Sequence, residues 1–343
     1  MRIRQAFATG LLALTPALTG CLTHTHSVLK TRLPTIVLST SLDHLLQMVD
    51  DRYNATQSAT LFVDISASSG GSRQGKVTDT AFSFSSYIIL QNPDHIRVIL
   101  TIPLYGKGLD MVSDGKSFKM LIPPRSCAIT GSDTAPPPPP PGAGESLSQR
   151  LYRLRPAVIL DSLLIRGLQP DQIVSMTQDS RPPIPATKTK TQIIEGKALR
   201  KDLVEDPDYD LEFLSQPKGQ AAQALRVVHI DRTNLLPWRQ DIYNADGKIE
   251  TQAFYDNYQK FGDINFPTKI VIQRPLDELG LTITVTRKTT FNQKFDPDQF
   301  VPDPITPSYV VQNMDDPASA ATNACAAHPE SPAATASPGT AKH

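Results

Sequence analysis

The stretch Asn92–Pro123, NPDHIRVILTIPLYGKGLDMVSDGKSFKMLIP, contains three apolar segments separated by two turns. The segments DHIRVILTI, LDMVS and KSFKMLIP have the lengths and apolar content of β-strands. Asp114-Gly115 separates the last two and allows the positive φ that a tight hairpin turn requires. Strands joined by so short a turn run in opposite directions, so the stretch predicts an antiparallel sheet.

The first of the two turns has an unusual composition. Turns of soluble proteins usually carry Asn, Asp, Ser, Gly or Pro, but here Leu104 and Tyr105 follow Pro103, which cannot donate to a strand ladder. Gly106 and Gly108 then allow the chain to reverse. We expect Leu104 and Tyr105 to project and to contact membrane lipid or cargo. The alternative is that they fold back and plug the end of the sheet.

The strand pattern recurs on both sides of this stretch. Before the stretch, the pattern appears in TLFVDIS and KVTDTAFSFSSYIILQ. After the stretch, it appears in YDLEFLS, ALRVVHID, PWRQDIYN, KIETQAFYDNYQ, PTKIVIQR and LGLTITVTRKTTF. Asp246-Gly247 forms a second predicted hairpin turn. In the last segment Leu281, Ile283 and Val285 alternate with threonines, so one face of that strand is apolar.

Two segments have helical periodicity. In residues 39–53 apolar side chains recur at the i, i+3, i+4, i+7 spacing: Leu42, Leu45, Leu46 and Val49. Residues 147–168 form the second segment, in which Pro156 starts a new helix or kinks the first. We therefore predict an α+β fold, a curved antiparallel half-barrel of about ten to eleven strands whose concave face is covered by helices.

The first residues are predicted to be a targeting segment. Arg2 and Arg4 precede an apolar run, 6–18, that is too short to span a bilayer as a helix. The run ends in Leu-Thr-Gly-Cys, which resembles the lipobox of bacterial lipoproteins and implies cleavage before Cys21 and acylation of that cysteine. The alternative is an ordinary signal peptide that happens to precede a cysteine.

Composition predicts the remaining organisation. We expect a signal peptide (1–20), a flexible tether (21–38), a folded domain (39–310) with a proline-rich insertion (126–145), and a disordered tail (311–343) rich in Ala, Pro, Ser and Thr. Besides Cys21 the chain has two cysteines, Cys127 and Cys325. They could form one disulfide in an oxidising periplasm. The low-complexity setting of Cys325 favours two unpaired thiols instead.

The sequence excludes some function classes. Lys and Arg number 34 and are balanced by 34 Asp and Glu without a dense basic run, so no nucleic-acid partner is predicted. None of the motifs GxSxG, HExxH, GxxxxGKS or CxxC is present, and the seven histidines are dispersed. We therefore predict neither an enzyme nor a metal site. The only predicted cofactor-like groups are the diacylglycerol and acyl chains attached to Cys21.

Three blocks resemble the LolA/LolB-type periplasmic lipoprotein carriers and receptors: NPDHIRVILTIPLYG…MVSDGKSFKMLIP, DIYNADGKIETQAFYDNY…FPTKIVIQRP and FNQKFDPDQFVPD. The resemblance spans residues 39–305. It implies a half-barrel lidded by helices, whose apolar cavity holds the acyl chains of lipoproteins without catalysis. The residues expected to line this cavity are Phe82, Phe84, Ile96, Leu281, Ile283 and Val285.

The lipobox-like Cys21 makes the chain more similar to LolB than to LolA, because LolB is a receptor that is itself anchored to the outer membrane by lipid. LolB has an apolar residue on a protruding loop, and the resemblance places Leu104 at about the position of that loop. The implied role is a lipid-anchored protein at the periplasmic face of the cell outer membrane that binds acyl chains or lipoproteins. Outer-membrane lipid, lipoprotein cargo and a periplasmic LolA-like carrier are the implied partners. The alternatives are an envelope sensor or interaction module resembling RseB, and a hydrolase of unrecognised geometry.

Overall fold

In the computed structural model of the chain, the described residues are 36–69, 79–80, 84–102, 106–135, 145–181, 206–216, 219, 221–286, 288–316, 318–319 and 324–327. Contacts divide the chain into two units, and all of these residues belong to the second, which comprises 35–181 and 206–343. The description below concerns this unit alone.

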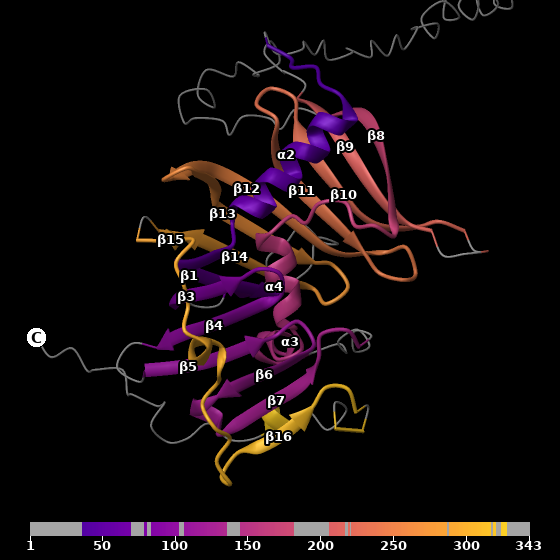
Figure 1. Ribbon diagram of the computed structural model, residues 1–343. Coiled ribbons are helices and arrows are strands. Elements are labelled where there is room, and N and C mark those ends of the chain that lie inside the picture. Colours follow the sequence, from indigo (N-terminus) through magenta and orange to yellow (C-terminus); the bar gives the residue numbers. More distant parts are fainter. Residues whose placement is uncertain are drawn as a thin grey trace, which may run out of the picture. The chain divides into compact units, whose positions relative to one another are not determined.

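The unit is organised around one curved sheet of 16 strands (Figure 1). Its order is β16-β7-β6-β5-β4-β3-β1-β14-β13-β12-β11-β10-β9-β8, with β2 and β15 also paired to β1. The strands are β1 (Ser58–Ser69), β2 (Asp79–Thr80), β3 (Phe84–Gln91), β4 (His95–Ile102), β5 (Gly106–Ser113), β6 (Ser117–Ile122), β7 (Cys127–Ser132), β8 (Gln172–Arg181), β9 (Asp206–Ser215), β10 (Gln223–Asp231), β11 (Leu236–Tyr243), β12 (Ile249–Phe261), β13 (Ile264–Arg274), β14 (Leu279–Val285), β15 (Thr290–Phe291) and β16 (Val310–Asn313).

Strand β1 joins the two halves of the sheet. It pairs with β3 on one side and with β14 on the other, both antiparallel. The strands after β3 continue the sheet in one direction and those before β14 continue it in the other. Because the order ends at β16 and β8, the described strands form an open sheet.

The two predicted hairpin turns are confirmed. Gly115, between β5 and β6, has φ +83°, and Gly247, between β11 and β12, has φ +72°. The Asp114 carboxylate accepts hydrogen bonds from the backbone N–H groups of Lys116 and Ser117 at 2.9 and 2.8 Å, which closes the first turn. A side chain at position 115 would be strained by this φ and would also meet the Asp94 side chain.

The helices lie on one face of the sheet: α2 (Leu42–Ala55), α3 (Leu147–Leu151) and α4 (Pro156–Leu163), with a short α7 (Ala324–Ala327) beside β16. Ser41 caps α2 by accepting from the His44 N–H. Pro156 begins α4, which is the first of the two alternatives that the sequence left open. Leu45 and Val49 of α2 pack on a cluster from β9 and β10. The α4 side chains join the larger core on the other strands.

The opposite face of β4 and β5 carries a buried ion pair. Arg97 donates to both carboxylate oxygens of Asp110, at 2.8 and 2.6 Å, and this hydrogen bonding raises the pKa of the guanidinium. The same guanidinium donates to the carbonyls of Gln299 and Val301 at 2.8 and 3.1 Å. These residues belong to or follow the 3-10 turn η3 (Pro297–Phe300), so Arg97 holds that segment across the strands.

The strand count corrects the prediction, because 16 strands are present rather than ten to eleven. Strand β7 lies within the predicted insertion, since Cys127-Ala128-Ile129 is apolar and precedes the prolines whose composition set the boundary. Strand β16 crosses the predicted start of the tail at 311 and pairs in parallel with β7. Strand β8 falls in a segment for which no strand was predicted.

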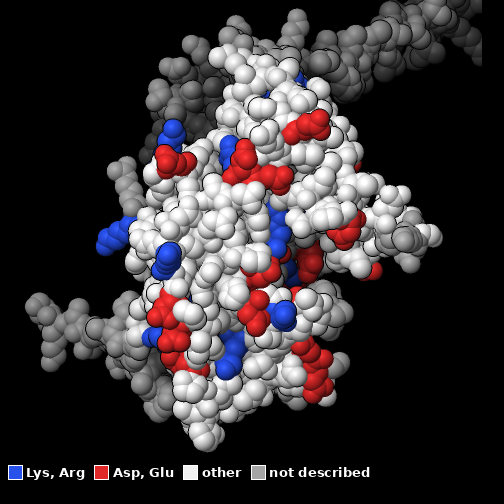
Figure 2. All heavy atoms as spheres, viewed as in Figure 1, with Lys and Arg blue, Asp and Glu red and all other residues white. Residues whose placement is uncertain are grey.

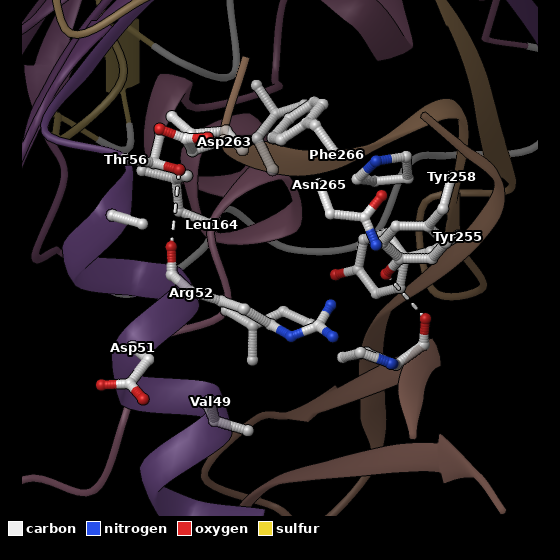
Figure 3. Close-up of a pocket in the computed structure, with 16 residues that line it drawn as sticks. Val49, Asp51, Arg52, Thr56, Leu164, Tyr255, Tyr258, Asp263, Asn265 and Phe266 are labelled. Carbon is white, nitrogen blue, oxygen red and sulfur yellow. Dashed lines mark hydrogen bonds between the residues drawn. The ribbon is translucent and has the colours of Figure 1, made fainter. Parts of the chain in front are cut away.

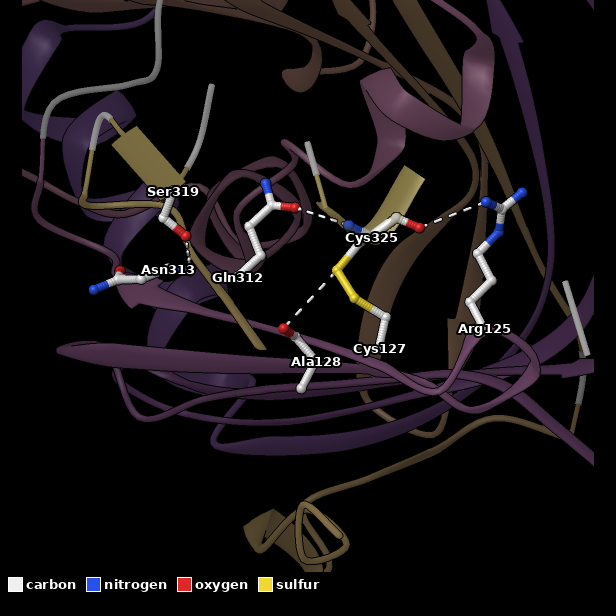
Figure 4. Close-up of a disulfide and its surroundings, with 7 residues drawn as sticks. All are labelled: Arg125, Cys127, Ala128, Gln312, Asn313, Ser319 and Cys325. Carbon is white, nitrogen blue, oxygen red and sulfur yellow. Dashed lines mark hydrogen bonds between the residues drawn. A yellow bond between two sulfur atoms is a disulfide. The ribbon is translucent and has the colours of Figure 1, made fainter. Parts of the chain in front are cut away.

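A disulfide joins Cys127 to Cys325, so the expectation of two unpaired thiols is wrong (Figure 4). The two Cα atoms are 5.5 Å apart, and both cysteines are fully buried. Cys325 N–H donates to the Gln312 side chain of β16 at 3.2 Å. The segment around Cys325 is therefore packed against β7 and β16, which its low-complexity composition did not indicate.

Candidate functional site

A cavity of about 240 Å³ lies at the C-terminal end of α2, between this helix, the end of α4 and strands β11–β13 (Figure 3). We call it the α2 cavity. It is lined mainly by apolar and aromatic side chains, with a few polar ones: Val49, Asp51, Arg52, Ala55, Thr56, Leu163, Leu164, Ile165, Pro237, Tyr255, Tyr258, Asp263, Ile264, Asn265, Phe266 and Pro267.

The position of the cavity follows from how α2 packs. Leu45 and Val49, one turn apart, are buried on β9 and β10. The last turn of the helix extends past this contact, so Arg52 and Ala55 reach over the cavity. Asp51, Ala55 and Asp263 are exposed and mark its mouth, whereas Val49 is buried at its inner end.

A backbone irregularity in β12 lies between the two tyrosines of the cavity wall. Residues three apart in a regular strand point to opposite faces. The pairing with β13 keeps one register on both sides of Asn257, but Asn257 has a φ of 56° and so departs from strand geometry. Tyr255 and Tyr258, on either side of it, both line the cavity. The Thr268 hydroxyl donates to the Asn257 carbonyl at 2.7 Å.

The polar groups of the wall differ in how they are satisfied. Tyr258 Oη donates to the Pro237 carbonyl at 2.7 Å. Tyr255 Oη is buried and has no hydrogen-bond partner among the described residues. Burial raises the pKa of both phenols, so both remain neutral hydrogen-bonding groups at physiological pH. Burial also lowers the pKa of the Arg52 guanidinium from its ordinary value of 12.5. Arginine side chains in proteins are effectively always protonated, so Arg52 remains a cation.

The residues predicted to line a cavity lie elsewhere. Ile96, Leu281, Ile283 and Val285 are buried in the larger core cluster, and Phe84 is half-buried on β3. None of these five lines the α2 cavity. Their role in lining a cavity for cargo stays a prediction.

Four other predicted site residues, Cys21, Phe82, Leu104 and Tyr105, lie outside the described residues. The roles assigned to them remain predictions.

Sequence reasoning did not identify Arg52, Tyr255 or Tyr258 as site residues. Arg52 lies in the last turn of a helix, where basic residues are common, so its position alone does not indicate a binding site. The one available signal was the segment Phe254–Tyr258, FYDNY, in which the aromatic residues break the period of two. Such a break in a strand indicates a local departure from regular strand geometry, and the structure has one at Asn257, whose φ is 56°.

A second polar cluster lies on the face of β9–β11 opposite α2. His229 Nδ1 is 2.7 Å from an Asp210 oxygen, and Nε2 is 3.5 Å from an Asp241 oxygen. Burial alone would lower the pKa of His229, but the hydrogen bonds and charges of the two carboxylates raise it to about 9. The imidazole is therefore protonated at neutral pH and cannot act there as a general base.

A buried carboxyl group belongs to the same cluster. Asp208 lies 2.9 Å from Arg181, whose guanidinium also pairs with Asp231 and stacks 4.1 Å from the ring centre of Trp238. The pKa of Asp208 is raised to about 7, because the effect of burial outweighs the opposite effect of the Arg181 charge. This cluster is best described as a structural network.

The network makes stability depend on pH. The pKa of His229 is about 9 in the folded protein against an ordinary 6.5, so its stabilisation is complete below pH 6.5 and is lost as the pH rises through 9. The shift corresponds to roughly 3 kcal/mol. We expect His229 to lower the free energy of unfolding of the full chain by about this amount between pH 6 and 10. The raised pKa of Asp208, about 7, adds a smaller fall as the pH passes through 7. Urea titrations at a series of pH values measure both.

The control for this effect is a second histidine. His229→Gln should remove the fall in stability between pH 8 and 10 and leave the smaller one near pH 7, which belongs to Asp208. His44→Gln, at an exposed position of α2, should leave both as in the unsubstituted protein. The same pH slope in the unsubstituted protein and in His229→Gln would show that His229 does not carry the effect.

Charges on the surface are mixed. On the face shown in Figure 2, Lys and Arg side chains are interspersed with Asp and Glu rather than gathered in one patch. None of the helices in the described residues is both long enough and apolar enough to cross a bilayer.

The chain is similar in structure to several solved proteins, but its sequence identity to them is low. A family model described only as an uncharacterized protein matches residues 187–306, less than half of the 343 residues. No curated protein matches significantly. A LolA superfamily protein from Nitrosomonas europaea is 13% identical with a TM-score of 0.45, covering 77% of this chain and 99% of that one. A DUF1329 family protein from Desulfovibrio piger is 12% identical with a TM-score of 0.45, covering 75% and 94%.

Likenesses of this size do not carry the properties of those proteins over to this chain. The motifs of the sequence predicted a resemblance to LolA/LolB-type proteins, and a LolA superfamily protein is among the solved structures that are similar to this chain.

Proposed function

We propose that this chain binds an acyl chain, of a lipid or of a lipoprotein, in the α2 cavity. The observation that carries the proposal is the cavity itself: about 240 Å³, with a wall that is mostly apolar and a mouth at the end of α2. Ligand sites usually have such walls, with a few polar groups, in volumes of roughly 300–1,000 Å³. A space slightly smaller than this range suits part of one chain, and each buried methylene contributes ~0.8 kcal/mol.

We further propose that the protein works at the periplasmic face of the outer membrane, anchored through Cys21, in lipoprotein localisation or envelope biogenesis. The Arg-flanked apolar run and the Leu-Thr-Gly-Cys segment support the anchor. The resemblance of the sequence blocks to LolA/LolB-type proteins supports the role. On this account the protein is a binding protein, and the side chains of the α2 cavity act by contact and desolvation rather than by catalysis.

The test blocks the mouth of the cavity. Ala55 is exposed at the mouth, so Ala55→Trp can fill the opening without crowding the core. Displacing two or three methylenes of the ligand should weaken binding of fluorescently labelled hexadecanoate by about 10- to 100-fold. Fluorescence titration of the purified full chain measures the affinity.

The neighbouring residue supplies a matched control. Asn54 is also exposed in the last turn of α2 but does not line the cavity. Asn54→Trp adds the same side chain at the same helix end, so it should bind the probe as tightly as the unsubstituted protein. Equal affinities for Ala55→Trp and Asn54→Trp would mean that the acyl chain does not enter the α2 cavity.

A further inference from the structure

Arg52 is a cation in a mostly apolar wall. Its guanidinium extends from the last turn of α2 toward the side of the cavity lined by Tyr255 and Tyr258 (Figure 3). Within the described part of the chain, no hydrogen bond or ion pair joins this guanidinium to another residue, and no carboxylate contributes to its pKa shift. A half-buried charge without a partner is costly, because it has lost part of its hydration without compensation.

The usual structural role of an arginine at this position is already filled by other groups. A basic side chain in the last turn commonly donates to the final helix carbonyls. In α2 the last four carbonyls accept from the side chains or backbone N–H of other residues: Thr56, Asn92, Gln57 and Asn292. The guanidinium is therefore not needed as a C-terminal cap.

Besides Arg52, the polar residues of the cavity lining are Asp51, Thr56, Tyr255, Tyr258, Asp263 and Asn265. Tyr255 keeps only 6% of its surface exposed, yet its hydroxyl has no partner among the described residues. Buried polar groups nearly always have a partner, so a hydroxyl group without one needs an explanation. The Asn265 side chain also lines the cavity. Together Arg52, Tyr255 and Asn265 offer a positive charge and N–H and O–H donors beside an apolar surface.

We propose that the ligand of the α2 cavity is a single-chain amphiphile with an anionic head, a carboxylate or a phosphate monoester, and that Arg52 and Tyr255 bind this head while the apolar wall binds the chain. This inference rests on the proposed function and narrows it to a ligand class. Guanidinium groups form short, charge-assisted and often bidentate hydrogen bonds with both anions. The head would supply the acceptors that Arg52 and Tyr255 lack within the described residues.

The experiment compares three ligands of the same chain length: hexadecanoate, hexadecyl phosphate and hexadecanol. Each competes with the fluorescent probe for the purified full chain at pH 8. The unsubstituted protein should bind one or both anions about 10- to 100-fold more tightly than the alcohol, as expected for hydrogen bonds to a charged group. Which anion binds more tightly distinguishes a fatty acid from a phosphorylated lipid.

Substitutions assign the preference to residues. Arg52→Gln should lower the affinity for the preferred anion about 10- to 100-fold and leave that for hexadecanol unchanged, and Arg52→Lys should restore part of the loss. Tyr255→Phe should give a smaller loss, also confined to the anions. Lys269→Gln, which removes an exposed cation from β13, controls for net charge and should have no effect.

The outcomes separate this inference from the proposed function. Equal affinities for anions and alcohol, or an anion preference that survives Arg52→Gln, would overturn the assignment of the head while chain binding stands. If none of the three ligands displaces the probe, or if the probe itself does not bind, the proposed function fails as well. Thermal unfolding of each variant confirms that a loss of affinity is not a loss of the fold.

Discussion

Removing the Cys127–Cys325 disulfide is expected to lower the free energy of unfolding by about 2–5 kcal/mol. The two cysteines are 198 positions apart in the sequence, so the bond closes a long loop and restricts the unfolded chain strongly. In the folded protein it fastens the segment around α7 to β7. Cys127→Ala/Cys325→Ala removes the bond without leaving a buried thiol, and urea unfolding of the full chain measures the change.

Reduction of the unsubstituted protein provides the comparison. With a thiol reductant, its unfolding midpoint should fall toward that of the double variant, while the variant itself should not respond. If the unsubstituted protein unfolds at the same urea concentration with and without reductant, the bond does not stabilise the fold.

Breaking the buried pair of Arg97 and Asp110 should have an effect of similar size. Asp110 is 0% exposed and accepts two hydrogen bonds from Arg97. Asp110→Ala leaves the guanidinium buried without its carboxylate, which typically costs about 3–5 kcal/mol. Arg97→Met/Asp110→Leu removes both charges and should recover part of this loss, although the carbonyls of Gln299 and Val301 then lose their donor.

A more exposed pair nearby serves as the control. Lys107 donates to Asp303 at 2.8 Å and also lies 3.3 Å from Asp110, and the Asp303 side chain is 58% exposed. Asp303→Ala should therefore change the free energy of unfolding by less than about 1 kcal/mol. Urea unfolding of the four proteins tests this ranking. A loss from Asp110→Ala no larger than that from Asp303→Ala would contradict a structural role for the buried pair.

The local elements were predictable from the sequence because their signals are local. Asp114-Gly115 and Asp246-Gly247 specify tight turns by their backbone conformation alone. The alternation of Leu281, Ile283 and Val285 specifies a strand with one buried face, and β14 has that face. The stripe of residues 42–49 specifies a helix that packs on one side, and α2 does so.

The features that the sequence did not predict depend on contacts between distant segments. The pairing of β16 with β7 and the disulfide join residues nearly 200 positions apart, and no local pattern encodes such a partner. The sequence pattern of an apolar strand face is the same whether that face lines a cavity or packs in a filled core. Ile96 therefore matched the expected lining residue by type, although it is buried in the core.

The candidate site was missed for a related reason. Its two tyrosines lie on either side of Asn257, whose φ is positive, and its cation comes from a helix some two hundred positions earlier. The irregular backbone at Asn257 leaves a trace in the sequence, the interrupted alternation of Phe254–Tyr258. Only the fold shows that Arg52 and Tyr255 line the same cavity.

The central claim is that an acyl chain occupies the α2 cavity, and photo-crosslinking tests it most directly. The full chain is loaded with hexadecanoate carrying a photoreactive diazirine, irradiated and digested, and the labelled peptides are identified by mass spectrometry. The account predicts labels within residues 49–56, 163–165 or 255–267, which line the cavity, and a loss of these labels in Ala55→Trp but not in Asn54→Trp. Labels confined to other parts of the chain, or unchanged in Ala55→Trp, would contradict it.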